Sequence, residues 1–80
     1  MTPRGRGVEA AILALRTRWG IDRADFAARW GGPLLREVES VLGTVPSRLV
    51  RDDGQSLALT SAGMRVGNAI WAELLALERA

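Results

Sequence analysis

The sequence carries one clear β-hairpin signal. Residues 48–51 (RLVR) and 56–60 (SLALT) are short strand-like runs, and the segment between them, DDGQ, places an Asp-Gly pair at the turn. This pair tolerates the positive φ angles of tight hairpin turns, so it predicts two antiparallel strands joined there. The segments on both sides are helical in pattern. The chain is therefore predicted to be mainly α with one small hairpin.

Three helices are predicted before the hairpin. The first begins at Val8 and ends at Gly20. The second is capped by Asp22, with Ile21 able to pack on Phe26, and the third runs from Pro33 to Gly43. The apolar residues of the first and third recur at helical spacing: Val8, Ala11, Ile12, Leu15 and Trp19, then Leu34, Leu35, Val38, Val41 and Leu42.

A fourth helix is predicted after the hairpin, with Thr60 as its N-cap. The order of helix, helix, helix, hairpin, helix is that of a winged-helix-like fold: a three-helix core, a two-stranded wing and a long C-terminal helix. The tryptophans Trp19, Trp30 and Trp71 all follow helical apolar patterns. We interpret them as core residues rather than as stacking platforms for a cofactor or nucleotide.

Eighty residues are enough for one domain. We expect residues 1–7 to be a flexible N-terminal segment and residues 8–80 to be a single domain that serves as the C-terminal accessory domain of a larger protein. No apolar run approaches the length of a membrane span, and no signal-peptide pattern follows the first arginines. A cytoplasmic location without membrane contact is expected.

The chain contains neither cysteine nor histidine. Disulfides and catalysis by either residue are thereby excluded, and so are thiolate and imidazole metal ligands. The nine carboxylates are scattered over caps, turns and helix faces, and they form no recognisable acid/base pair. We therefore predict no catalytic, cofactor-binding or metal-binding residue in this chain.

The charge distribution argues against reading of duplex DNA by the third helix and the wing. Residues 33–56 carry three arginines and four carboxylates, a net charge of −1, whereas residues 1–32 carry six arginines and three carboxylates, a net charge of +3. DNA affinity depends largely on cations at the phosphates. No nucleic-acid partner is expected, although a stand-alone winged-helix module for DNA or protein binding remains the alternative function.

Two segments together resemble a known family. LALRTRWGIDRADFAARWGG and LALTSAGMRVGNAIWAELL are similar to the C-terminal domain of oxygen-independent coproporphyrinogen III oxidase-like radical SAM proteins, the HemN group that includes the haem chaperone HemW. The matching positions are Leu15, Arg16, Gly20, Ile21, Asp22, Phe26, Trp30, Gly31, Leu59, Thr60, Gly63, Asn68, Leu74 and Leu75. The GGP at residues 31–33 and the GTVPSRL at residues 43–49 are looser matches.

The resemblance implies a non-catalytic accessory domain in porphyrin or haem biosynthesis. In the parent proteins a preceding barrel holds a 4Fe-4S cluster and S-adenosylmethionine and performs the oxidoreductase chemistry on coproporphyrinogen, while chaperone relatives handle haem. Without cysteine, this chain cannot hold the cluster. The implied partners are the radical SAM barrel of the same parent chain and, through the parent, a porphyrin or haem.

Three residues are candidates for the contact with that barrel: Arg16, Gly67 and Asn68. Gly67 and Asn68 are unusual inside a helix, since each costs helix stability relative to alanine. They are explained either by close packing in the domain's own core or by an interface with the barrel. Arg16 would pair either with Asp22 or another internal carboxylate, or with a propionate of the substrate.

Overall fold

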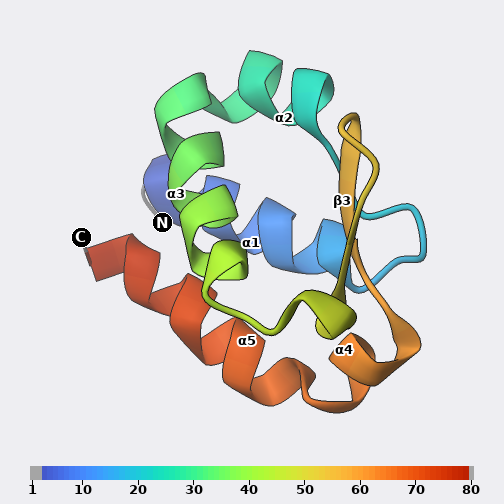
Figure 1. The fold of residues 1–80 in the computed structure, drawn as a ribbon. Helices are drawn as coiled ribbons and strands as arrows, with labels where there is room; N and C mark the ends of the chain where they lie inside the picture. The colour runs from blue at the N-terminus through green and yellow to red at the C-terminus, as the bar shows by residue number, and fades with distance from the viewer. Residues whose placement is uncertain (1–2, 80) are drawn as a thin grey trace.

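The computed structural model describes residues 3–79, and it confirms a mainly helical, winged-helix-like fold with a small sheet (Figure 1). Helix α1 runs through the middle of the domain, where it contacts α2, α3, α5 and β3. The elements in chain order are α1 (Pro3–Leu15), β1 (Ile21–Asp22), α2 (Arg23–Trp30), α3 (Gly32–Gly43), the 3-10 helix η1 (Ser47–Leu49), β2 (Val50–Asp52), β3 (Ser56–Leu59), α4 (Ser61–Arg65), α5 (Gly67–Leu75) and the 3-10 helix η2 (Ala76–Arg79).

The predicted hairpin is present, and a third strand joins it. Strands β2 and β3 pair antiparallel with Val50 opposite Leu59, and Gly54 takes the positive φ of 90° that the turn requires. Strand β1, which the sequence did not reveal, pairs with the other edge of β3, so the order is β1-β3-β2. Gly20, with a φ of 72°, allows this pairing because a Cβ there would collide with the Leu57 carbonyl.

Helix α1 begins and ends earlier than expected. It starts at Pro3 rather than Val8, so residues 3–7 are already helical, while residues 1–2 lie outside the described residues. It ends at Leu15, where the Thr17 hydroxyl donates to the Ala14 carbonyl at 2.7 Å and accepts from the Gly20 amide at 3.2 Å. This turn carries Trp19 into solvent. The core role predicted for Trp19 is therefore wrong.

The single helix expected after the wing is divided in two. Helix α4 ends at Arg65, and Val66, with φ of −106° and ψ of 18°, separates it from α5. Gly67 is consequently the first residue of α5 rather than a residue in a helix interior. The helix-propensity cost that made Gly67 puzzling is thus much reduced, because the chain is already interrupted there.

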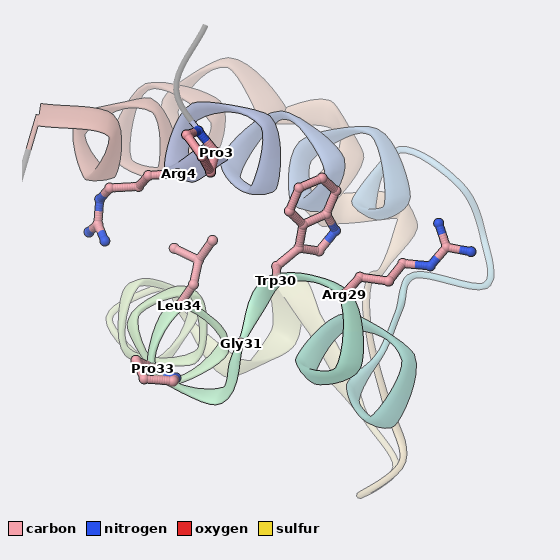
Figure 2. Close-up of a pocket in the computed structure, with 7 residues that line it drawn as sticks. All are labelled: Pro3, Arg4, Arg29, Trp30, Gly31, Pro33 and Leu34. Carbon is pink, nitrogen blue, oxygen red and sulfur yellow. The ribbon is translucent and has the colours of Figure 1, made fainter.

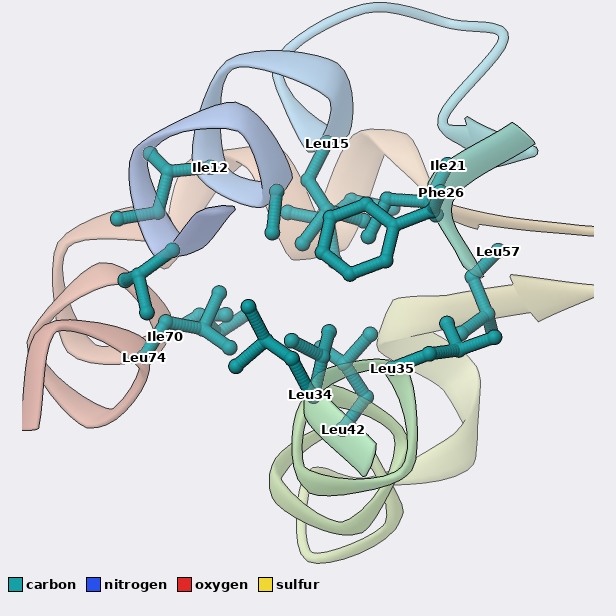
Figure 3. Packing of buried hydrophobic residues seen from close by; sticks show 14 residues of the cluster. Ile12, Leu15, Ile21, Phe26, Leu34, Leu35, Leu42, Leu57, Ile70 and Leu74 are labelled. Carbon is teal, nitrogen blue, oxygen red and sulfur yellow. The ribbon is translucent and has the colours of Figure 1, made fainter. Parts of the chain in front are cut away.

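The core lies where α1, α3 and α5 meet the inner face of the sheet (Figure 3). Its largest fully buried side chains are Leu15, Ile21, Leu74, Val8 and Val38. Trp30, Trp71 and Met64 pack against this cluster and are half-buried. Among the described residues, no helix has both the length and the apolarity to cross a membrane.

Candidate functional site

Trp71 brings two of the three candidate residues together. The Arg16 guanidinium, just beyond the end of α1, lies over the Trp71 ring with its Cζ atom 5.5 Å from the ring centroid. One turn earlier in α5, a Cβ on Gly67 would lie 2.8 Å from Nε1 of the same indole. Gly67 therefore leaves room for the ring, and the ring restrains Arg16 through a cation–π contact.

Arg16 does not form the carboxylate pair that we considered. Within residues 3–79 it has no ion pair, and the Asp22 carboxylate instead accepts the Asp25 amide at 3.0 Å as the N-cap of α2. The arginine side chain is exposed and turned toward α5. Its guanidinium donors are thus available to an external acceptor.

Asn68 lies on the outer face of α5. It is exposed, and no hydrogen bond joins its side chain to any other described residue. The helical period places it on one stripe with Trp71 and Leu75. Its amide therefore plays no part in the core. Close packing in the core can account for the buried Gly67 but not for Asn68.

A groove of about 240 Å³ runs between α1 and the α5–η2 segment beside these residues. Leu13 and Leu75 leave 54% and 47% of their surface exposed there. We call this surface the Trp71 groove, and its lining residues are Glu9, Ile12, Leu13, Arg16, Trp71, Leu75 and Glu78. An apolar floor with a charged rim is the usual build of a protein-contact surface.

Sequence reasoning missed the apolar part of this groove, although a signal was present. Leu13 falls outside the α1 stripe that faces the core, and Leu75 lies one position beyond the buried Leu74. Large apolar residues on the outer face of an amphipathic helix can mark a contact with another body. Trp71 was predicted only as a core residue, whereas it is half-buried and forms one wall of the groove.

A larger cavity, of about 490 Å³, opens between the start of α1 and the α2–α3 junction. Figure 2 shows Pro3, Trp30 and Leu34 around it, with the charged ends of Arg4 and Arg29 directed away. Arg4 is engaged elsewhere, since its Nη2 donates to Glu37 at 2.8 Å and its Nε to the Leu77 carbonyl. This ion pair lowers the pKa of Glu37, and it ties α1 to α3.

Arg23 links three elements through two carboxylates. Its Nε donates to Glu39 of α3 at 2.7 Å, and its Nη1 and Nη2 donate to Asp52 of β2 at 2.8 and 2.9 Å. These bonds, together with the Gly54 amide, lower the pKa of Asp52 to about 2. Glu39 and Asp52, which contribute to the negative net charge of residues 33–56, are therefore paired with an arginine of the same domain.

The segment Leu59–Gly63 after the wing has a structural role. Thr60 accepts the Gly63 amide at 3.2 Å as the N-cap of α4 and donates to the Arg48 carbonyl at 2.9 Å. Gly63 is buried so close to the Leu49 carbonyl that a Cβ would overlap it. These contacts fix η1 against α4, so Thr60 and Gly63 are structural residues.

Within the described range, no three carboxylates converge as they would around a metal ion. What the fold does assemble is a small helical domain with an exposed, apolar-centred contact groove.

The comparison with protein families agrees with this type of domain. The sequence model of the HemN C-terminal domain matches residues 1–66, and the chain belongs to this family. Neither the curated proteins nor the solved structures gave a match. The matched stretch contains the α1 side of the Trp71 groove, whereas α5, with Gly67 and Asn68, follows it. Family membership makes the chain an accessory C-terminal domain of HemN-like proteins.

Proposed function

We propose that this domain packs on the radical SAM barrel of a coproporphyrinogen dehydrogenase-like or haem-chaperone parent through the Trp71 groove. The observation that carries the proposal is the exposure of Leu13 and Leu75 beside the restrained Arg16 and the unbonded Asn68. The domain performs no catalysis in this proposal. The barrel supplies the 4Fe-4S cluster, S-adenosylmethionine and the contact with porphyrin or haem.

The groove has the physical properties that such a contact needs. Burying the exposed parts of Leu13, Trp71 and Leu75 would remove apolar surface from water, at about 25 cal/mol for each Å². Arg16 is held in place by the indole, so less side-chain entropy is lost when it binds a carboxylate. Asn68 offers both a donor and an acceptor one turn away from Trp71.

Binding of the isolated 80-residue chain to a HemN-type barrel that lacks its own C-terminal domain tests the proposal. Isothermal titration calorimetry would give the affinity, and the expected result is a one-to-one complex. Leu13→Asp and Leu75→Asp should each weaken it at least about ten-fold, because a charge in the centre of an apolar contact is left unpaired. Val66→Asp is the matched control, since Val66 is also exposed but lies outside the groove.

Asn68→Ala separates docking from folding. The thermal midpoint of the isolated chain should stay unchanged or rise slightly, because Asn68 is exposed, bonds nothing within the described domain, and is a weaker helix former than alanine. The affinity for the barrel should fall. Equal losses of affinity in the groove variants and in Val66→Asp, or a clear loss of stability in Asn68→Ala, would refute the assignment of the interface to this groove.

A further inference from the structure

The most exposed large apolar side chain of the described residues is that of Trp19, on the turn between α1 and β1. Trp19 keeps 69% of its surface exposed. The Arg18 guanidinium covers part of the ring, with its Cζ atom 4.9 Å from the ring centroid. Arg51 of β2 joins them by donating an Nη2 hydrogen bond to the Arg18 carbonyl at 2.6 Å. We call these three residues the Arg18–Trp19–Arg51 patch.

The sheet fixes the position of this patch. Gly20, the residue after Trp19, packs on the backbone of β3, and Arg51 stands opposite Ala58 of the same strand. The aromatic ring and the two guanidinium groups are thus carried by neighbouring parts of one small sheet. Trp19 itself is outside the buried core, so its indole is open to a partner.

The cations of the patch are not neutralised by the domain. Within residues 3–79 neither Arg18 nor Arg51 forms an ion pair. The pKa of Asp53 is lowered mainly by the amides of Ser56 and Gln55, which donate to its Oδ1. The charge of Arg51 contributes least to this shift. Arg51 uses one of its five N–H donors on the Arg18 carbonyl, which leaves donors for an anion.

A largely exposed aromatic ring beside guanidinium groups that form no ion pair matches the repeating unit of a single strand: a base that stacks and a phosphate that binds arginine. A duplex hides the faces of its bases, so it could use only the charges. A small ligand would need an enclosing pocket, whereas the Trp19 ring is largely open to solvent. An acidic peptide would satisfy the arginines but not the indole.

We propose that the Arg18–Trp19–Arg51 patch binds single-stranded nucleic acid by stacking a base on Trp19 and pairing phosphates with the two arginines. This inference is independent of the proposed docking on a barrel. It revises the expectation of no nucleic-acid partner, which rested on the charge of residues 33–56. Two of the three patch residues lie outside that stretch.

Fluorescence anisotropy of a labelled 12-nucleotide oligothymidylate, titrated with the 80-residue chain at several salt concentrations, tests the proposal. Trp19→Ala should weaken binding about five-fold or more, the effect of losing one stacked base. Arg18→Gln/Arg51→Gln should reduce the slope of log affinity against log salt by about 1.4, since each phosphate contact on a single strand contributes about 0.7. Circular dichroism checks that the variants remain folded.

The control variant Arg36→Gln/Arg65→Gln removes the same charge from α3 and α4. Support requires that it binds better than the patch double variant and that a duplex of the same length binds more weakly than the single strand. Three results would overturn the proposal: no binding at low salt, equal losses in the two double variants, or an unchanged affinity in Trp19→Ala. Displacement by polyglutamate with no effect of Trp19→Ala would assign the patch to acidic peptides instead.

Discussion

Replacing Gly63 with alanine should destabilise the domain by about 2 kcal/mol, although Gly63 lies in helix α4, where alanine is normally favoured. A Cβ at this position would overlap the Leu49 carbonyl oxygen and lie 3.1 Å from its carbon. The carbonyl cannot move freely, because it also accepts the Thr60 amide at 3.0 Å. The strain therefore falls on the junction between η1 and α4.

The magnitude follows from three opposing effects. Forcing an extra methyl group into a packed site costs about 1–3 kcal/mol. Weakening the Thr60 amide bond to Leu49 costs up to about 1 kcal/mol, and replacing glycine by alanine in a helix returns about 1 kcal/mol. For a domain of 80 residues, a net loss of about 2 kcal/mol lowers the thermal midpoint by about 8–16 °C.

Urea and thermal unfolding followed by circular dichroism would measure this change. Gly43→Ala is the matched control, because Gly43 is also helical and a Cβ there meets no atom within 4 Å. It should leave stability unchanged or raise it slightly. If Gly63→Ala were as stable as the wild type, or were to gain as much as Gly43→Ala, the close approach of α4 to η1 would be refuted.

Two further variants probe the wing and the cap. Thr60→Ala should lower the free energy of unfolding by about 1 kcal/mol in urea titrations, because α4 loses its N-cap hydrogen bond; an unchanged midpoint would contradict the cap. The pKa of Asp52, about 2, lies below its ordinary value of 3.8, so its pairing with Arg23 stabilises the fold above pH 4 and is lost as the pH falls from 4 to 2. Asp52→Asn should therefore show a smaller loss of stability over that range than the wild type, and identical pH profiles would exclude a role for the pair.

The candidate site was only partly accessible from the sequence. Arg16, Gly67 and Asn68 could be named as candidates. That Trp71 contacts both Arg16 and Gly67 could not be predicted, because Trp71 meets Arg16 only when α1 and α5 pack together. Leu13 could have been noticed as an apolar residue outside the core stripe of α1. Nothing in the pattern indicated that it lines the same groove as Trp71.

The sequence by itself determined the features that depend on near neighbours. The Asp-Gly turn, the N-caps Asp22 and Thr60 and the helical apolar stripes are set by the local preferences of the backbone, and the absence of cysteine and histidine excludes their chemistry anywhere in the fold. These signals were sufficient to predict the mainly helical fold with its wing.

Only the tertiary structure decided the features that join distant segments. Strand β1 has two residues and exists through its pairing with β3, and the single Arg23 side chain unites α2, α3 and the wing. The exposure of Trp19 likewise depends on where α1 stops against the sheet. The energies of such contacts arise between residues far apart in the chain, so no local pattern specifies them.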